Sequence, residues 1–411
     1  MRVFLLVALA SCVTPRIPAP DHPPAPDRYA RAASPDPAAR ASAADELAFD
    51  PSPQAVDLLL ILHQRDVDPA VRSRAAGAIA ARRDPALDAS LQASARTDPD
   101  PAVRDASEAA HRRLWPLRKR PGTAAGLSLL CPGCGQLYLG EPEGGAYLGT
   151  AAALIGSSVL LLRGQGQVSL DEPAPSVRVP VAIPLLMAAQ NLWFYSIFDG
   201  YRDARVLRGD TGYRHAISRE SLPHLASAPF RPGVLKRPWV WGGVPLALGA
   251  GIAVSVLASR DDGVQRPTIF DVRKVNVLGH DFARGPGFAA GAAYYAALFV
   301  PVGVGEEALF RGLIQTELEE RLGTWGGLAT ASAIFGAVHF FNFLEDPRSA
   351  AVAVPVITVL GSSLGLAYIR TGHKLETSVA MHFWYDFLLS AAAFAADPQH
   401  QPFVVQYGAA M

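Results

Sequence analysis

Three segments in the C-terminal half of the chain carry ionisable side chains within long apolar stretches. They read Glu306-Glu307-Ala308-Leu309-Phe310-Arg311, Phe335-Gly336-Ala337-Val338-His339 and His382-Phe383-Trp384-Tyr385-Asp386. A charged side chain at the centre of a bilayer costs about 3 kcal/mol or more unless it is paired or faces water. We therefore expect these segments to be membrane helices whose polar side chains share one site.

Helical spacing determines which of these side chains can meet. Glu307 and Arg311 are four residues apart, as are His382 and Asp386, so each pair shares one face of a helix. Glu306 points about 100° away from Glu307 and is free to face another helix. A buried glutamate with histidines from two other helices is sufficient to hold and deprotonate a water molecule. The pattern indicates hydrolysis within a membrane, with Glu307 and Arg311 as a supporting ion pair.

In this order on successive helices, Glu-Glu-x-x-x-Arg, Phe-x-x-x-His and His-x-x-x-Asn/Asp resemble the signature of the CPBP family, which comprises CAAX proteases and bacteriocin-processing enzymes and is also called Abi. The resemblance covers about residues 236–396. It implies an intramembrane glutamic endopeptidase that acts on a membrane-associated peptide or protein and needs no metal. It also implies that Glu306 and His339 activate the hydrolytic water and that Phe335 is a supporting residue.

The resemblance assigns His382 and Asp386 to stabilisation of the oxyanion. Asp386 stands where the prenyl protein peptidases of this family have Asn. Because an ionised Asp cannot donate a hydrogen bond to an oxyanion, Asp386 must either be protonated or orient His382 instead.

Two other readings of the same residues stay open. The polar side chains could hold helices together in a non-catalytic scaffold or immunity protein, since polar groups hydrogen-bond across membrane helices. Alternatively, Glu306, His339 and His382 could bind zinc in a membrane peptidase, although the chain lacks His-Glu-x-x-His spacing. Two further histidines, His280 and His373, are predicted to be solvated surface residues.

Composition supports a membrane protein with one soluble part. Half of the 411 residues are hydrophobic, 18% are charged and the formal net charge is zero, so no overall field favours nucleic acid as a partner. The predicted fold class is all-α: a bundle of about 7–8 spans preceded by a short α-solenoid. Apolar stretches of suitable length occur at about 124–140, 145–162, 179–198, 239–258, 286–304, 325–343, 351–369 and 376–396.

The stretch at 124–140 contains Pro132, Gly133 and Gly135, so a re-entrant hairpin is an alternative to a span. It also holds Cys131 and Cys134, a CxxC pair compatible with redox or metal chemistry.

A repeat of fixed length precedes the membrane region. Asp36-Pro37, Asp68-Pro69 and Asp100-Pro101 begin 32 residues apart, and each opens an Ala-rich helical segment. Asp caps a helix and Pro fits its first turn. Equal spacing of this size is typical of a helical solenoid, and the segments resemble HEAT repeats. We expect residues 35–114 to form helix pairs that hold a protein partner.

The remaining segments complete the predicted organisation. Residues 1–12 resemble a signal peptide with a lipobox that ends at an acylated Cys12, and residues 13–34 form a Pro-rich tether. A membrane region (118–205), a basic cytoplasmic loop (206–236) and the protease domain (237–396) follow. This organisation predicts a multi-pass protein of a bacterial inner membrane. Lipidation would place the repeats outside and require 124–140 to cross; Arg118, Lys119 and Arg120 favour the cytoplasm.

Overall fold

The protein is described by a computed structural model covering residues 27–164, 177–208, 218, 220–245, 247–249, 267–278, 280–343 and 347–398. The chain divides into two compact units. We call the unit that contains residues 27–120 and 204–208 the repeat unit, and the unit that contains the other described residues from Pro121 onward the membrane unit; each is described by itself. The predicted signal peptide and Cys12 lie outside the described residues.

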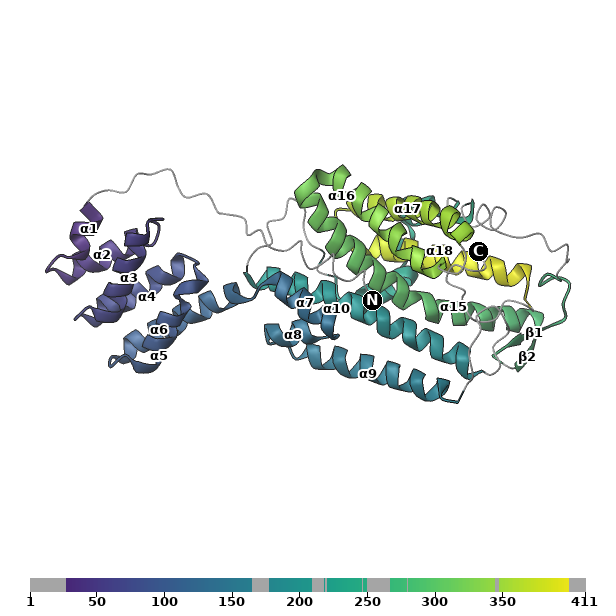
Figure 1. Cartoon of the computed structure of the whole chain (residues 1–411), viewed down its shortest axis with the longest axis horizontal. Coiled ribbons are helices and arrows are strands. Elements are labelled where there is room, and N and C mark those ends of the chain that lie inside the picture. The colour runs from purple at the N-terminus through teal and green to yellow at the C-terminus, as the bar shows by residue number, and fades with distance from the viewer. Residues whose placement is uncertain are drawn as a thin grey trace. The chain divides into compact units, whose positions relative to one another are not determined.

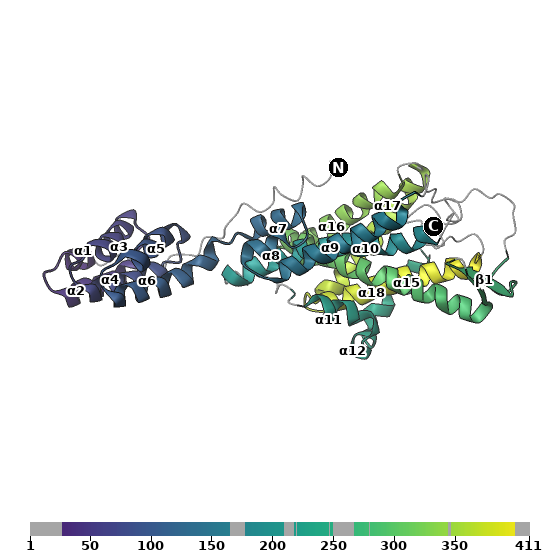
Figure 2. The ribbon, with the colours of Figure 1, turned by 90° about the horizontal axis from the view of Figure 1, so that it is seen from below.

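In its described part, the repeat unit is an array of six α-helices in two layers. Helices α2, α4 and α6 pack side by side in one layer, and α1, α3 and α5 lie along the other (Figure 2). Their bounds are α1 Asp27–Ala32, α2 Pro37–Leu47, α3 Pro53–Arg65, α4 Pro69–Ala81, α5 Asp88–Thr97 and α6 Pro101–Leu114. This confirms the predicted helical repeats. The predicted tether is too long, because residues 27–32 are helical and the Tyr29 hydroxyl donates to Asp50.

The repeating Asp-Pro pairs begin helices as predicted. Asp36, Asp68 and Asp100 each accept a hydrogen bond from the backbone N–H two residues later, and Pro occupies the first helical position. Because the cap satisfies an N–H that has no partner within the helix, it stabilises each helix start by about 1 kcal/mol. The 32-residue period therefore fixes where α2, α4 and α6 begin.

Within its described residues, the membrane unit contains five helical segments that are long and apolar enough to cross a bilayer. They are α9 (Glu143–Leu162), α10 (Arg178–Arg208), a continuous segment Arg284–Phe341, α17 (Pro347–Arg370) and α18 (Leu375–Ala396). The continuous segment contains α15 (Arg284–Glu307), the π-helix η6 (Ala308–Gln315), α16 (Thr316–Val338) and part of the short helix η7 (His339–Phe343). It unites two predicted spans and bends at Gly323 (φ 73°).

The predicted total of 7–8 spans is not confirmed. Half of the stretch 239–258 lies outside the described residues, and its described part includes most of the short helix α13 (Pro238–Gly242). Helices α15, α16, α17 and α18 pack around one another (Figure 1).

The first predicted span, 124–140, folds back on itself. It forms α7 (Pro121–Leu130) and α8 (Cys134–Leu139), which pack against each other and are about 15 and 9 Å long. Neither helix reaches across a hydrocarbon core of about 30 Å. The alternative of a re-entrant hairpin is therefore the observed one.

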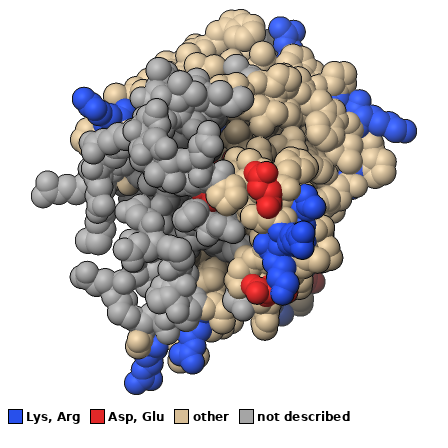
Figure 3. Space-filling view, turned by 90° about the vertical axis from the view of Figure 1, so that its right-hand side faces the viewer, with Lys and Arg blue, Asp and Glu red and all other residues tan. Residues whose placement is uncertain are grey.

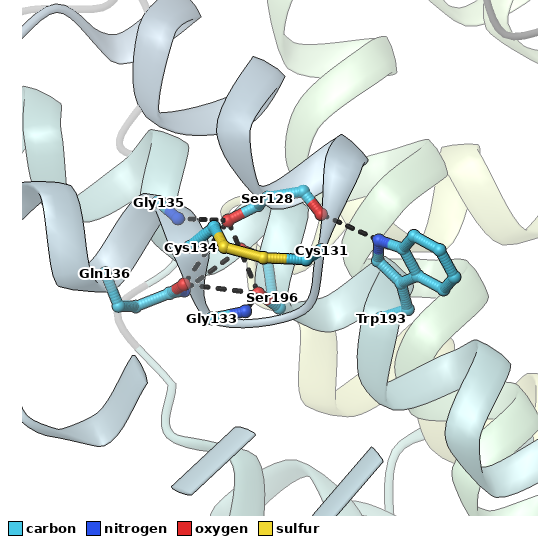
Figure 4. Close-up of a disulfide and its surroundings, with 8 residues drawn as sticks. All are labelled: Ser128, Cys131, Gly133, Cys134, Gly135, Gln136, Trp193 and Ser196. Carbon is cyan, nitrogen blue, oxygen red and sulfur yellow. Dashed lines mark hydrogen bonds between the residues drawn. A yellow bond between two sulfur atoms is a disulfide. The ribbon is translucent and has the colours of Figure 1, made fainter. Parts of the chain in front are cut away.

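Backbone and side-chain contacts hold this hairpin against α10 (Figure 4). The Gly133 N–H donates to Ser196 Oγ at 2.8 Å, and Trp193 Nε1 donates to the Ser128 carbonyl at 2.7 Å. Gly133 has a φ of 86°, which favours glycine, and an added Cβ there would collide with the Gly144 carbonyl. Cys131 and Cys134 form a disulfide across the turn. These contacts fix the tip of the hairpin.

The hairpin predicts that both of its ends emerge on one side of the membrane. In a cysteine-free background, Thr123→Cys and Glu143→Cys should therefore react with an impermeant maleimide from the same side. Arg163→Cys, at the far end of α9, should react from the opposite side. Labelling of positions 123 and 143 from opposite sides would mean that 124–140 crosses, as export of the repeats by a lipidated Cys12 requires.

A small β-hairpin departs from the all-helical expectation. Strands β1 (Lys274–Val277) and β2 (His280–Ala283) pair antiparallel directly before α15. Val275 and Val277 are buried against α15 and α18, whereas His280 is exposed, as predicted. The described part of this end carries scattered charges of both signs on an otherwise uncharged surface (Figure 3). The candidate site lies far from it, because Glu306 is 22 residues, or about 33 Å, from Arg284.

Candidate active site

The three polar segments meet in the membrane unit. Glu306 and Glu307 end α15, His339 begins η7, and His382 lies seven residues, or about 10 Å, into α18 from Leu375. Both glutamates and His382 are buried. The site is therefore closer to the α17–α18 turn than to the β-hairpin.

Glu306 lies between the two histidines. Its Oε2 atom is 3.9 Å from Nε2 of His339 and 3.8 Å from Nε2 of His382. This oxygen is buried and accepts no hydrogen bond from the described residues. Separations of this size exceed a direct hydrogen bond and suit groups that share a water molecule.

Hydrogen bonds at Nδ1 fix the orientation of both imidazole rings. Nδ1 of His339 lies 2.7 Å from the carbonyl oxygen of Phe335, and Nδ1 of His382 lies 2.7 Å from Oε1 of Glu307. Because both oxygens are acceptors, each Nδ1 must carry the proton and donate it. Both rings consequently present Nε2 to Glu306.

Glu307 is the centre of a fully buried ion pair. Its Oε1 accepts a hydrogen bond from Nη1 of Arg311 at 2.9 Å, besides the one from His382. Nη2 of Arg311 donates to the Gly361 carbonyl at 3.0 Å, and the guanidinium stacks 4.2 Å from the ring centroid of Phe335. Sequence reasoning anticipated the Glu307–Arg311 pair but missed that Glu307 also orients His382.

The packing of the Phe335 ring beside Arg311 and α17 depends on a glycine. An added Cβ at Gly361 would lie 2.9 Å from the Phe335 ring and 3.4 Å from Nη2 of Arg311. A side chain at this position would push aside the Phe335 ring, on which the guanidinium of Arg311 stacks. Gly361 is thus a supporting residue that no signal in the sequence identified.

Asp386 faces the same nitrogen as Glu306. Its Oδ2 lies 3.4 Å from Nε2 of His382, one helical turn along α18, and its side chain is 25% exposed. The hydrogen bond that orients the His382 ring comes from Glu307 at Nδ1, so Asp386 is not needed for that purpose. Both roles that the sequence allowed for Asp386, a protonated donor or a group that orients His382, remain predictions.

The π-helix η6 continues the row of polar side chains that begins at Glu307. In an α-helix each four-residue step turns a side chain by about 40°. The wider π turn offsets this drift, so Arg311 and Gln315 both face α17. Gln315 Nε2 donates to the Gly365 carbonyl at 3.2 Å and to Glu319 at 2.7 Å.

The row ends at a buried histidine. Nε2 of His373 lies 3.0 Å from Oε2 of Glu319, and only 7% of His373 is exposed. The prediction of a solvated His373 is therefore wrong. The turn before α18 folds inward because Glu319, buried on α16, offers a carboxylate there.

One other group has the geometry of metal ligands. Among the described residues, Glu220, His224 and Glu376 are the three whose ligand atoms lie within 4.8 Å of one another. Glu376, however, already forms ion pairs with Arg231 and Arg237. Two guanidinium groups on one carboxylate disfavour a bound cation. This group is better described as a cluster of ion pairs that joins the segment before α13 to the start of α18.

The membrane unit is a bundle of apolar helices that encloses buried carboxylate and imidazole groups. Comparison with known proteins agrees: residues 288–388 match the family model described as Type II CAAX prenyl endopeptidase Rce1-like, and residues 25–112 match HEAT repeats. The two parts of the chain are thus similar to the Rce1-like family and to HEAT repeats, the resemblances that the sequence motifs indicated. Searches of curated proteins and of solved structures found no match.

Proposed function

We propose that the protein is an intramembrane endopeptidase that hydrolyses a peptide bond of a membrane-associated peptide or protein. The observation that carries the proposal is the position of Glu306, whose free carboxylate oxygen lies within 4 Å of two imidazole nitrogens. The match to the Rce1-like family over residues 288–388 supports it. The setting is the inner membrane of a bacterium.

In the proposed reaction Glu306 is the general base. Its carboxylate takes a proton from a water molecule positioned with Nε2 of His339, and the water oxygen attacks the substrate carbonyl carbon. His382, protonated at both nitrogens, donates from Nε2 to the resulting oxyanion. The carboxylate of Glu307 at Nδ1 stabilises this cation. Glu306 then gives the proton to the leaving amine as the carbon–nitrogen bond breaks.

Asp386 is proposed to assist the oxyanion as a neutral acid. An amide supplies the same donor without a proton, so Asp386→Asn should retain cleavage within about tenfold of the wild type, the size of one hydrogen bond's contribution. Asp386→Ala should lose more, because it removes the donor. Initial rates of the purified variants check this. If Asp386→Asn were as inactive as Asp386→Ala, an ionised Asp386 would be required instead.

The test of the proposed function is a comparison of cell membranes. Membranes that contain wild-type protein should hold new peptide termini that are missing when Glu306→Ala replaces it, and mass spectrometry of labelled termini detects them. If the two sets of termini were the same, the endopeptidase proposal would fail. Complementation of a deletion strain by Glu306→Ala would favour the non-catalytic scaffold.

A further inference from the structure

The repeats of the repeat unit are joined by a ladder of arginine–aspartate pairs. Arg40 donates through Nε and Nη2 to both carboxylate oxygens of Asp66, at 2.7 and 2.8 Å. Arg72 does the same to Asp98, at 2.9 Å for both bonds. In each case the acid lies 26 residues after the arginine, on the turn of the next repeat. The hydrogen bonds from Arg72 hold the pKa of Asp98 below its usual value.

The third nitrogen of each guanidinium is used in another repeating contact. Nη1 of Arg40 donates to the carbonyls of Ser34 and Pro35, and Nη1 of Arg72 donates to those of Asp66 and Val67. These bonds tie the arginine to the turn before its own helix. They fix the direction in which the Nε and Nη2 fork points, which is toward the next repeat.

Arg104 in α6 repeats the first contact but not the second. Its Nη1 donates to the carbonyls of Asp98 and Pro99, at 2.8 and 3.1 Å. Among the described residues, no carboxylate lies at its Nε and Nη2. The Arg104 side chain is half-buried. The last repeat therefore holds a guanidinium in the same way as the two before it, but no carboxylate among the described residues pairs with its Nε and Nη2.

The following sequence does not supply the acid. The position equivalent to Asp66 and Asp98 is Leu130, and residues 109–140, a full repeat length, contain neither Asp nor Glu. The segment 111–120 instead adds five lysine and arginine residues. A second copy stacked end to end would present Ser34 at this register, which has no carboxylate. Because Arg112 and Arg118 already pair with Glu108 and Asp88, the guanidinium of Arg104 is the group that complements an acidic side chain from outside the array.

We propose that Arg104 is the docking point for a protein partner that presents a carboxylate on a tight turn, as the Asp-x-Asp-Pro turns of the array itself do. The partner would stack on α6 as a further repeat would, with its carboxylate held by two parallel hydrogen bonds. Planar two-point recognition of this kind requires arginine, since lysine offers only a point charge.

The chemical state of Arg104 tests the proposal in the full-length purified protein. Phenylglyoxal, which modifies unpaired guanidinium groups, should react several-fold faster with Arg104 than with Arg40 or Arg72, as peptide mass spectrometry reports. The blocked peptide Asp-Pro-Asp-Pro, a copy of residues 98–101, should slow that reaction. The matched peptide Asn-Pro-Asn-Pro should not.

A second measurement distinguishes two-point hydrogen bonding by the Arg104 guanidinium from a general attraction of the peptide to positive charge. Saturation-transfer NMR signals of the acidic peptide should fall about tenfold with Arg104→Lys, the loss expected for one hydrogen-bonded charged pair. Arg112→Lys, at an exposed arginine that pairs with Glu108, should leave them unchanged. Retention of binding by Arg104→Lys would overturn the proposal. So would slow modification of Arg104 without peptide, or protection by phosphatidylglycerol vesicles but not by the peptide.

Discussion

Replacing Glu306 with glutamine should lower the rate of peptide-bond cleavage by about 10³-fold, the middle of the range for loss of a general base. The amide cannot take a proton from water, yet it has nearly the same size and polarity as the acid. The protein should therefore remain folded and inserted. Initial rates of purified protein on a substrate identified from membranes measure the effect.

The matched control for this change is Glu320→Gln. Glu320 lies in the same continuous helical segment as Glu306 but is exposed, so its replacement should leave the rate and the thermal stability unchanged. Equal activity of Glu306→Gln and Glu320→Gln would remove Glu306 from the mechanism. His339→Ala should reduce the rate in the same way as Glu306→Gln, since both residues face the same water position.

Replacing Glu307 with glutamine should act on stability. Glu307 is the buried partner of both Arg311 and His382, so the neutral amide leaves a guanidinium without its counter-charge. Breaking a buried pair in this way costs about 3–5 kcal/mol. The yield of folded protein and its midpoint of thermal unfolding in detergent should both fall.

Two controls separate this result from a general effect of charge removal. Glu108→Gln breaks a pair with the same four-residue spacing on the exposed face of α6, where ion pairs contribute little, and should have almost no effect. Adding Arg311→Met to Glu307→Gln should recover part of the lost stability, because the unpaired charge is then gone. If Glu307→Gln unfolded at the wild-type temperature, the supporting role of the pair would be wrong.

The residues of the site could be identified from the sequence because placing an ionisable side chain in a bilayer costs much free energy. Glu306, His339 and His382 stand out as charged or titratable groups within apolar stretches, and four-residue spacing links Glu307 to Arg311. The bond from His382 to Glu307 could not be predicted. It depends on the rotation of α18 against α15, which the packing of both helices decides.

The repeats were predictable in detail, and the membrane unit only in outline. An Asp-Pro pair that recurs at a fixed period predicts a capped helix start from local sequence alone. Helices α2, α4 and α6 therefore begin where expected. The π-helix after Glu307, by contrast, has no sequence signal and reflects contacts with α17. The same holds for His373, which is buried because Glu319 lies opposite it.

Engineered metal binding tests most directly whether the three segments form one site. Glu306→His would place a third imidazole between His339 and His382, which suits tetrahedral zinc. The account predicts about one tightly bound zinc ion per molecule for this variant, measured by elemental analysis after dialysis, and none for Glu320→His or the wild type. Equal zinc content in Glu306→His and Glu320→His would contradict the shared site. Stoichiometric zinc in the wild type would contradict a metal-free mechanism.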